Sequence, residues 1–316
     1  MKKIRAGVIG TGYLGQFHAE KYAGLPNVEL MGIVEKDAAR GEQIARKLNT
    51  EAFTDLSHLL GKVDAVSIVV PTVLHYQIAK QFLDAGVHVL LEKPMTVTLE
   101  QADELIALAT LKKVILQIGH IERFNPAVTA IQPLLRSPAY LQAERCAPFT
   151  IRCTDVNVVL DLMIHDLDIV TALAGSPPIN VSAAGSSIIT KEIDTAAARI
   201  VFASGCVADV TASRISDEKK RLLRIFDGET LYTADYQTQK AFTSRRGTGA
   251  VPEFVANEIS TERRDTLQEE IKEFISCIEH NTRPTVSGAE GKNALALARM
   301  ITRSIENRIT EFVPFT

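Results

Sequence analysis

Hydrophobic and polar residues follow one another along the first third of the chain in a pattern typical of strands that alternate with helices. Short runs that are apolar throughout predict strands buried on both faces, and apolar residues three or four positions apart predict helices. The expected strands cover residues 4–9, 28–34, 65–70, 87–91 and 114–118. The expected helices cover residues 14–23, 37–48, 75–85 and 99–111. This alternation predicts a parallel sheet covered by helices on both faces.

The pattern changes after about Gly119, where runs joined by tight turns begin. Ser204–Gly205 and Asp227–Gly228 each separate two short apolar runs, and such dipeptides favour hairpins. Further helices are expected from Asn125–Pro126, at 161–174, at 267–278 and at 289–305. We therefore predict an α/β fold with an N-terminal Rossmann parallel sheet over 1–119. A C-terminal α+β domain with a largely antiparallel open sheet is expected over 120–316.

The composition fits this two-domain organisation. The chain has 316 residues, of which 46% are hydrophobic and 23% charged, as expected for a globular protein with a substantial core. Its net charge of -3 argues against nucleic acid as the main partner, because phosphate binding favours a basic surface. Its apolar runs are too short to span a bilayer, and glycines interrupt the apolar start. We therefore expect a cytoplasmic protein with no membrane partner.

The four cysteines give no sign of a metal site, because none forms a C-x-x-C pair and no histidine cluster accompanies them. They are Cys146, Cys153, Cys206 and Cys277. We expect no bound metal and interpret these cysteines as small buried side chains in a reducing compartment.

The string Gly10–Thr11–Gly12–Tyr13–Leu14–Gly15 follows the first expected strand and begins the first expected helix. This is the context that a dinucleotide-binding G-x-G-x-x-G motif requires. Gly10 would permit the tight turn, Gly12 would let a pyrophosphate approach the backbone, and Gly15 would let the helix pack on the strand.

Glu35 lies just past the second expected strand, 20 positions beyond Gly15. A carboxylate at this spacing accepts hydrogen bonds from the adenosine ribose hydroxyls and repels a 2′-phosphate. It therefore favours NAD over NADP, although the nearby Lys36 and Arg40 soften that preference.

Two further strings stand where expected strands end. Glu92–Lys93–Pro94 follows the strand at 87–91, and Val70–Pro71–Thr72–Val73–Leu74–His75 follows the strand at 65–70. Open α/β sheets bind ligands at these carboxyl ends. Together with the glycine motif, both strings resemble the Gfo/Idh/MocA family of oxidoreductases, and the resemblance covers the whole chain. It implies NAD as the cofactor, with Lys93 beside the nicotinamide and the substrate hydroxyl.

Asp161 and His165 are four residues apart, which would place them on one face of a helix. The family that the chain resembles has a D-x-x-x-H pattern at this place. The resemblance implies that Asp161 and His165 complete a site with Lys93. We interpret Asp166 and Asp168, on the same helix, as capping or structural charges.

Arg123 lies in the string Gly119–His120–Ile121–Glu122–Arg123–Phe124–Asn125–Pro126, which joins the two expected domains. We expect its side chain to reach cofactor or substrate. The cofactor-binding residues that we predict are Gly10, Thr11, Gly12, Tyr13, Leu14, Gly15, Glu35, Pro71, Thr72, His75, Glu92, Lys93 and Arg123.

The family resemblance implies reversible oxidation of a secondary alcohol on a sugar ring. His165 would take the hydroxyl proton, Lys93 would stabilise negative charge on the same oxygen, and Asp161 would fix the imidazole. Which of Lys93 and His165 is the immediate base stays open.

The substrate is suggested by two strings, 119–128 and 161–170, which are similar to a branch of the family that oxidises UDP-linked N-acetylhexosamines at the 3-position. One alternative is an inositol or free-sugar dehydrogenase. A catalytically silent NAD-binding sensor is another, but the intact Lys93, Asp161 and His165 argue against it.

The sequence of the second domain also predicts that the protein forms a homodimer or homotetramer. Near residue 200 its sequence has apolar residues on both faces of a strand, with Ile200 and Phe202 on one face and Val201 and Ala203 on the other. An apolar face open to water would form a large exposed patch, which pairing of subunits would bury.

Overall fold

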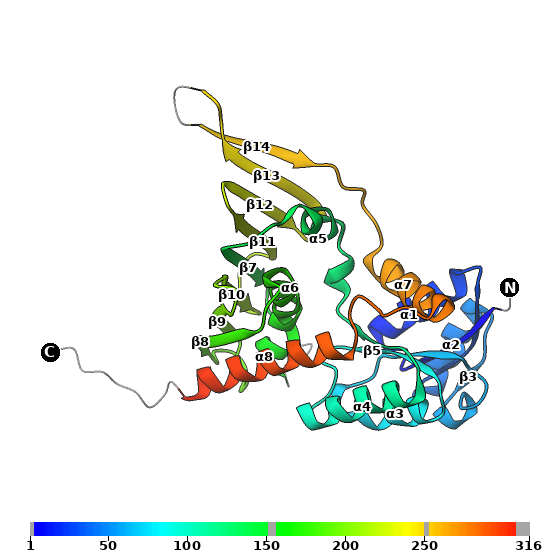
Figure 1. Ribbon diagram of the computed structural model, residues 1–316. Coiled ribbons are helices and arrows are strands. Elements are labelled where there is room, and N and C mark those ends of the chain that lie inside the picture. Colours follow the sequence, from blue (N-terminus) through cyan, green and yellow to red (C-terminus); the bar gives the residue numbers. More distant parts are fainter. Residues whose placement is uncertain (1–2, 151–155, 250–252, 308–316) are drawn as a thin grey trace. The chain divides into compact units, whose positions relative to one another are not determined.

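The computed structural model describes residues 3–150, 156–249 and 253–307 (Figure 1). The chain forms two compact units. The first combines Met1–Ile121 with Asp265–Lys292, and the second combines Glu122–Arg264 with Asn293–Thr316. The expected change near Gly119 lies close to the first of these divisions. The later segment Asp265–Lys292 belongs to the first unit, however, so the units differ from two consecutive domains at 1–119 and 120–316.

The first unit contains a parallel six-stranded sheet in the order β3-β2-β1-β4-β5-β6. Its strands are β1 (Ile4–Ile9), β2 (Val28–Val34), β3 (Ala52–Phe53), β4 (Ala65–Ile68), β5 (His88–Glu92) and β6 (Leu116–Gly119). This order confirms the predicted Rossmann sheet, and it places the point where the strand order reverses between β1 and β4. The two-residue strand β3 was not predicted.

Helices of the first unit follow the expected positions closely. They are α1 (Tyr13–Gly24), α2 (Ala38–Leu48), α3 (Thr72–Asp84), α4 (Leu99–Lys112) and α7 (Thr266–His280), with a short 3-10 helix η1 (Leu56–His58). Asp37 caps α2, since its side chain accepts a hydrogen bond from the Arg40 amide at 3.1 Å. Side chains of α1 and α7, including Tyr22 and Phe274, share one buried cluster with residues of β1, while α3 and α4 pack together (Figure 1).

The second unit contains an eight-stranded sheet in the order β14-β13-β12-β11-β7-β10-β9-β8. Its strands are β7 (Tyr140–Cys146), β8 (Pro178–Ser186), β9 (Thr195–Phe202), β10 (Val207–Ser213), β11 (Lys220–Asp227), β12 (Thr230–Asp235), β13 (Lys240–Arg246) and β14 (Phe254–Ile259). All neighbours are antiparallel except β7 and β10. The prediction of a largely antiparallel sheet is therefore confirmed, as are the hairpin turns at Ser204–Gly205 and Asp227–Gly228.

The remaining elements are η2 (Ile121–Phe124), α5 (Pro126–Ile131), η3 (Gln132–Leu134), η4 (Val159–Met163), α6 (Ile164–Ala174) and α8 (Gly288–Asn307). Asn125 caps α5, which begins where the sequence predicted it, because the side-chain oxygen of Asn125 accepts from the Ala127 amide at 3.1 Å. In the second unit, α6 packs on β7 and β10, and α5 packs on β12 and β13 (Figure 1). The boundary between the units falls within α8, after Lys292.

The sheet face away from these helices is not the uniformly apolar surface that we expected. Ile200 and Phe202 are buried on the helix side, but Val201 shares the other face with Arg199, which forms an ion pair with Asp209 at 2.6 Å. Ala203 lies in the turn after β9 and not on the strand. That face therefore combines apolar positions with paired charges, because alternate residues of several strands are charged.

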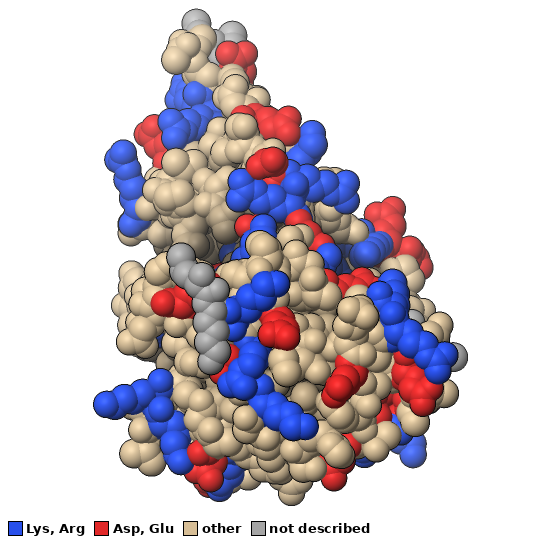
Figure 2. Space-filling view, turned by 90° about the vertical axis from the view of Figure 1, so that its right-hand side faces the viewer, with Lys and Arg blue, Asp and Glu red and all other residues tan. Residues whose placement is uncertain are grey.

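Within the described ranges, Cys206 and Cys277 are buried and Cys146 is partly exposed, whereas Cys153 lies outside those ranges. The same ranges contain no group of three or more histidine, cysteine or acidic side chains placed to hold a metal ion. Among their helices, none combines the length and apolar character that crossing a bilayer requires. Figure 2 shows basic and acidic side chains interleaved over one face of the molecule.

Candidate functional site

The turn from β1 to α1 has the form that the glycine motif predicts. Gly10 has a φ of +85°, a backbone conformation that favours glycine. A methyl group on Gly15 would collide with the carbonyl oxygen of Gly10, so only glycine lets α1 begin this close to β1. A methyl group on Gly12 would meet no atom within 4 Å, so open space adjoins the start of α1. These features fit a dinucleotide pyrophosphate, which would take hydrogen bonds from the free amides of the first helical turn.

Glu35 stands at the carboxyl end of β2 and contacts the same turn. One of its oxygens, Oε2, accepts hydrogen bonds from the amide and the hydroxyl of Thr11 at 2.9 and 3.0 Å, and Oε1 accepts from the Asp37 amide at 3.2 Å. Burial alone would raise the pKa of Glu35, but these hydrogen bonds outweigh it and hold the pKa below its ordinary value. Glu35 therefore presents an ionised carboxylate beside the motif, and its contact with ribose stays a prediction.

A cavity of about 260 Å³ adjoins Glu35. It is lined by Glu35, Ala38, Gly41, Glu42, Ala52, Phe53, Thr54 and His58. The carboxylate of Glu35 in this wall disfavours a 2′-phosphate group, whereas that of Glu42 is paired with Arg46 at 2.9 Å. Glu35 thus supports the predicted preference for NAD.

His75 links the ends of β4 and β5. Its Nε2 lies 2.8 Å from the Val70 carbonyl oxygen, and its Nδ1 lies 2.9 Å from that of Pro94. Burial lowers the pKa of His75, although both carbonyl contacts and the charge of Glu92 oppose the shift. The predicted segments around Pro71, Thr72 and Lys93 are thus joined through a buried imidazole at the edge of the sheet.

Glu92 and Lys93 stand at the end of β5, as predicted. Glu92 is only 8% exposed, whereas Lys93 is partly exposed. The Lys93 amide donates to Oε2 of Glu92 at 3.2 Å. Of the other predicted residues of this unit, Thr11 is buried, Leu14 is partly exposed, and Tyr13 is 68% exposed.

Asp161 and His165 lie on one continuous helical segment of the second unit, and both are partly exposed. The expectation of a single α-helix over 161–174 is wrong at its first turn, because Val159–Met163 form a π-helix before α6 begins. Asn157 caps this segment by accepting from the Leu160 amide at 3.0 Å. Such π turns often occur at functional sites. The prediction that Asp161 and His165 share one face assumed the residue spacing of an α-helix, and the wider π turn changes that spacing.

Arg123 has a partner that the sequence did not suggest. Its Nε and Nη2 donate to the two oxygens of Asp168 at 2.6 and 3.1 Å, and both side chains are almost fully buried. Bidentate pairing of this kind fixes a guanidinium firmly. Arg123 is therefore part of a buried ion pair, and its contact with cofactor or substrate stays a prediction.

A second buried cluster lies around Arg145 on β7, and sequence reasoning missed it. Arg145 donates to both oxygens of Asp166 at 2.6 and 3.0 Å and to Glu122 at 2.9 Å. Arg221 on β11 lies opposite Arg145 in register, with its Nη1 3.7 Å from Glu122. Asp166 and Asp168 are thus structural charges, as expected. Their partners lie 21 and 45 positions away, which explains why no local pattern indicated them.

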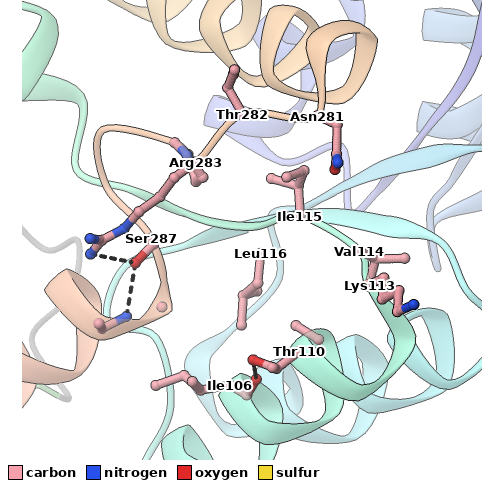
Figure 3. Close-up of a pocket in the computed structure, with 14 residues that line it drawn as sticks. Ile106, Thr110, Lys113, Val114, Ile115, Leu116, Asn281, Thr282, Arg283 and Ser287 are labelled. Atoms are coloured by element: carbon pink, nitrogen blue, oxygen red, sulfur yellow. Dashed lines mark hydrogen bonds between the residues drawn. The ribbon is translucent and has the colours of Figure 1, made fainter.

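The cavity in Figure 3, of about 380 Å³, lies at the other edge of the Rossmann sheet. Its walls include Thr110 near the end of α4, Leu116 at the start of β6 and Ser287 before α8. Because parallel strands share one direction, this is the amino edge of the sheet, opposite Glu92 and Gly119. None of the predicted site residues lines it.

Two family models match the chain. Residues 4–120 match the oxidoreductase family with an NAD-binding Rossmann fold, and residues 154–310 match the C-terminal alpha/beta domain of that family. The chain belongs to the Gfo/Idh/MocA family of oxidoreductases. It is therefore an NAD-dependent oxidoreductase, as the sequence predicted.

Individual relatives resemble the chain over nearly its whole length. It is 39% identical over 310 residues to the UDP-N-acetylglucosamine 3-dehydrogenase of Acidithiobacillus ferrooxidans, covering 97% of this chain and 98% of the relative. A solved structure of the enzyme of that name from the same organism has a TM-score of 0.93 and 37% identity, covering 98% of this chain and 100% of the other. The inositol 2-dehydrogenase of Rhizobium meliloti is 25% identical, over 96% of this chain and 98% of its own.

Proposed function

We propose that the protein oxidises a UDP-linked N-acetylhexosamine at its 3-hydroxyl, with NAD as the hydride acceptor. The main support is the 39% identity to a UDP-N-acetylglucosamine 3-dehydrogenase over nearly the full length of both chains. The chain also retains Lys93 of the E-K-P motif and the Asp161–His165 pair that the family pattern requires.

Three side chains would act on the substrate. His165 accepts the hydroxyl proton, because an imidazole titrates near neutral pH and suits a general base. Lys93 donates a hydrogen bond to the same oxygen and stabilises the negative charge that develops there. Asp161 orients the imidazole of His165. Bound NAD supplies the acceptor for the hydride that leaves the carbon, so that the secondary alcohol becomes a ketone.

The turn around Gly10 and Gly12 would hold the pyrophosphate of NAD, and Glu35 would accept from the adenosine ribose. Pro71, Thr72 and Lys93 stand at neighbouring strand ends of the same edge, where the nicotinamide half would follow. In this arrangement His75 joins the two strand-end segments and is a positioning residue.

The assay follows NADH absorbance while the purified protein is offered NAD with UDP-N-acetylhexosamines, UDP-hexoses, inositols and free sugars. We expect turnover with a UDP-N-acetylhexosamine, and UDP alone should inhibit competitively. Turnover of an inositol without inhibition by UDP would instead favour a polyol dehydrogenase. This is the second candidate function, because the chain is 25% identical to an inositol 2-dehydrogenase. Binding of NAD without turnover of any compound would favour the NAD-binding sensor.

We also propose that the protein acts in the cytoplasm as a homodimer or homotetramer. The face of the second sheet that carries Val201 and the Arg199–Asp209 pair is the candidate interface, because it offers both apolar area and charges of both signs. Analytical ultracentrifugation at micromolar concentration tests the assembly, and a monomer would contradict it.

A further inference from the structure

A chain of buried polar side chains runs beneath the E-K-P segment of the first unit. Tyr22 on α1 and Ser67 on β4 are joined by a hydrogen bond of 2.8 Å between their hydroxyl oxygens. Ser67 lies 3.1 Å from Nδ1 of His18, whose Nε2 lies 3.3 Å from Oε1 of Glu92. Tyr22, Ser67 and His18 are completely buried. The chain ends at Glu92, whose other oxygen accepts from the Lys93 amide at 3.2 Å.

One arrangement of protons gives this chain a direction. With the proton of His18 on Nε2, Nδ1 accepts from the Ser67 hydroxyl, and the Nε2 N–H faces Oε1 of Glu92 at 3.3 Å, an electrostatic contact whose geometry falls short of a hydrogen bond. The Tyr22 hydroxyl then donates to the Ser67 oxygen. All donors point toward Glu92, so the chain favours an ionised carboxylate at that end.

The electrostatics of Glu92 agree with this direction. Burial alone would raise its pKa, but the contact with His18 and the charge of Lys93 outweigh burial and hold the pKa below its ordinary value. Glu270 on α7 is fully buried as well, and burial together with the charges of Glu92 and Glu273 raises its pKa well above the ordinary value. The neutral form of Glu270 is therefore favoured, and the negative charge stays on Glu92.

The neighbouring strand leaves room for this carboxylate. Gly119 on β6 is in register with Glu92, and a methyl group there would lie 2.6 Å from Oε1 of Glu92. Well-packed apolar side chains usually stabilise an interior as well as a buried polar chain does, or better. A polar chain that also requires a glycine opposite it is thus better explained by function than by stability.

We propose that Glu92 is a positioning residue for Lys93 and that His18, Ser67 and Tyr22 orient Glu92 for that purpose. The inference rests on the proposed function, in which Lys93 contacts the reacting oxygen. Glu92 fixes the backbone of Lys93 through the amide contact and places a negative charge beside its ammonium group. His18 fixes the carboxylate in turn, so that a change at His18 acts on Lys93 through Glu92.

Two substitutions at His18 separate positioning from packing. His18→Gln keeps an amide N–H that can donate to Glu92, whereas His18→Leu keeps much of the volume and loses the donor. We expect kcat to fall by about ten- to a hundredfold in His18→Leu and Glu92→Gln, because small displacements of a reacting group have effects of this size. His18→Gln should recover most of the activity. KM for NAD should change little in the two His18 variants.

A readout that needs no substrate distinguishes failure of this proposal from failure of the proposed function. The rate at which acetic anhydride labels Lys93 is measured by mass spectrometry in the protein without substrate, with the exposed Lys113 as internal reference. We expect Glu92→Gln and His18→Leu to raise the labelling of Lys93 relative to Lys113 several-fold, since the side chain of Lys93 loses its fixed position.

Leu105→Ala on α4 is the control for general destabilisation, because Leu105 is fully buried in the same unit and lies outside the polar chain. This variant should lower Tm without changing the labelling ratio. Unchanged labelling and kcat in Glu92→Gln and His18→Leu, with only Tm lowered, would overturn the proposal. Altered labelling of Lys93 in a protein that oxidises no sugar would retain the positioning role and reject the proposed function.

Discussion

Gly15 stands so close to Gly10 that its Cα faces the carbonyl oxygen of Gly10 with no room for a methyl group. The first turn of α1 is therefore pressed against the end of β1, and the helix amides face the space beside Gly12. The glycine of a nucleotide-binding motif thus acts here through backbone packing.

We expect Gly15→Ala to lower stability and weaken NAD binding together. The added methyl group must displace either α1 or the turn, at a cost of about 1–3 kcal/mol or more. Thermal unfolding and titration with NAD measure the two effects. Gly24→Ala is the matched control at the other end of α1, where a methyl group would meet no atom within 4 Å and Tm should stay the same or rise. Normal NAD affinity in Gly15→Ala would contradict the assigned role of the turn.

Cofactor preference should depend on Glu35. Glu35→Ala removes both the carboxylate that repels a 2′-phosphate and the acceptor for Thr11. We therefore expect weaker NAD binding and a smaller ratio between the Kd values for NADP and NAD. Glu42→Gln is the control, because Glu42 lines the same cavity but pairs with Arg46. A wild-type protein that prefers NADP would reject the prediction.

The sequence predicted the Rossmann sheet well because its information is local. Runs such as Ala65–Ile68 are buried throughout, and caps such as Asp37 and Asn125 act within three residues of their helix. The second sheet was harder, since β7 pairs in parallel with β10 across more than 60 positions of chain.

In the candidate site too, the local motifs could be predicted from the sequence and the long-range contacts could not. The motifs of the glycine turn and the E-K-P segment lie at the sheet edge where the pattern placed them, but their support comes from distant residues. His18 meets Glu92, and Arg123 meets Asp168, over 45 or more positions. A single sequence gives no signal for such pairs. A charged side chain such as that of Arg123 is then easily interpreted as a contact to a ligand.

Catalysis should depend strongly on His165 and Lys93. His165→Ala should lower kcat by about 10²–10⁴-fold, the usual contribution of a positioned acid or base. Lys93→Ala should do likewise while NAD affinity stays nearly intact, because the contacts proposed for the adenosine and pyrophosphate of NAD lie at Gly10–Gly15 and Glu35. Steady-state kinetics and NAD titration test both variants, with Tm measured on each. A folded His165→Ala protein with the wild-type kcat would reject the mechanism.

The three groups should also behave as one unit. Asp161→Asn should be milder than His165→Ala and should shift the pH profile of kcat, because in the proposed mechanism the Asp161 carboxylate supports the protonated imidazole. In the His165→Ala background, loss of Asp161 should cost little more, since groups that act together have non-additive effects. Additive losses, with an unshifted pH profile for Asp161→Asn, would show that Asp161 does not act through His165.

The pH dependence of the protein's stability should reflect the titration of Glu270. Its side chain is buried near Tyr22, Glu92 and Glu273, and its pKa is raised well above the ordinary value of 4.5. The folded protein therefore retains a proton that the unfolded chain releases above that value. Stability from this group is complete below the unfolded pKa and is lost as pH rises through the folded pKa.

Glu270→Gln removes that titration, so the difference in Tm between variant and wild type should move in favour of the variant from about pH 5 to about pH 8. A constant offset is expected from the substitution itself, and only its change with pH is diagnostic. Glu269→Gln is the control at the neighbouring position, where the carboxylate pairs with Lys272 near the surface. Its offset from wild type should change much less with pH. A Glu270→Gln offset that stays constant over this range would show that Glu270 is ionised in the folded protein, and the negative charge beneath Lys93 would then be shared between Glu270 and Glu92.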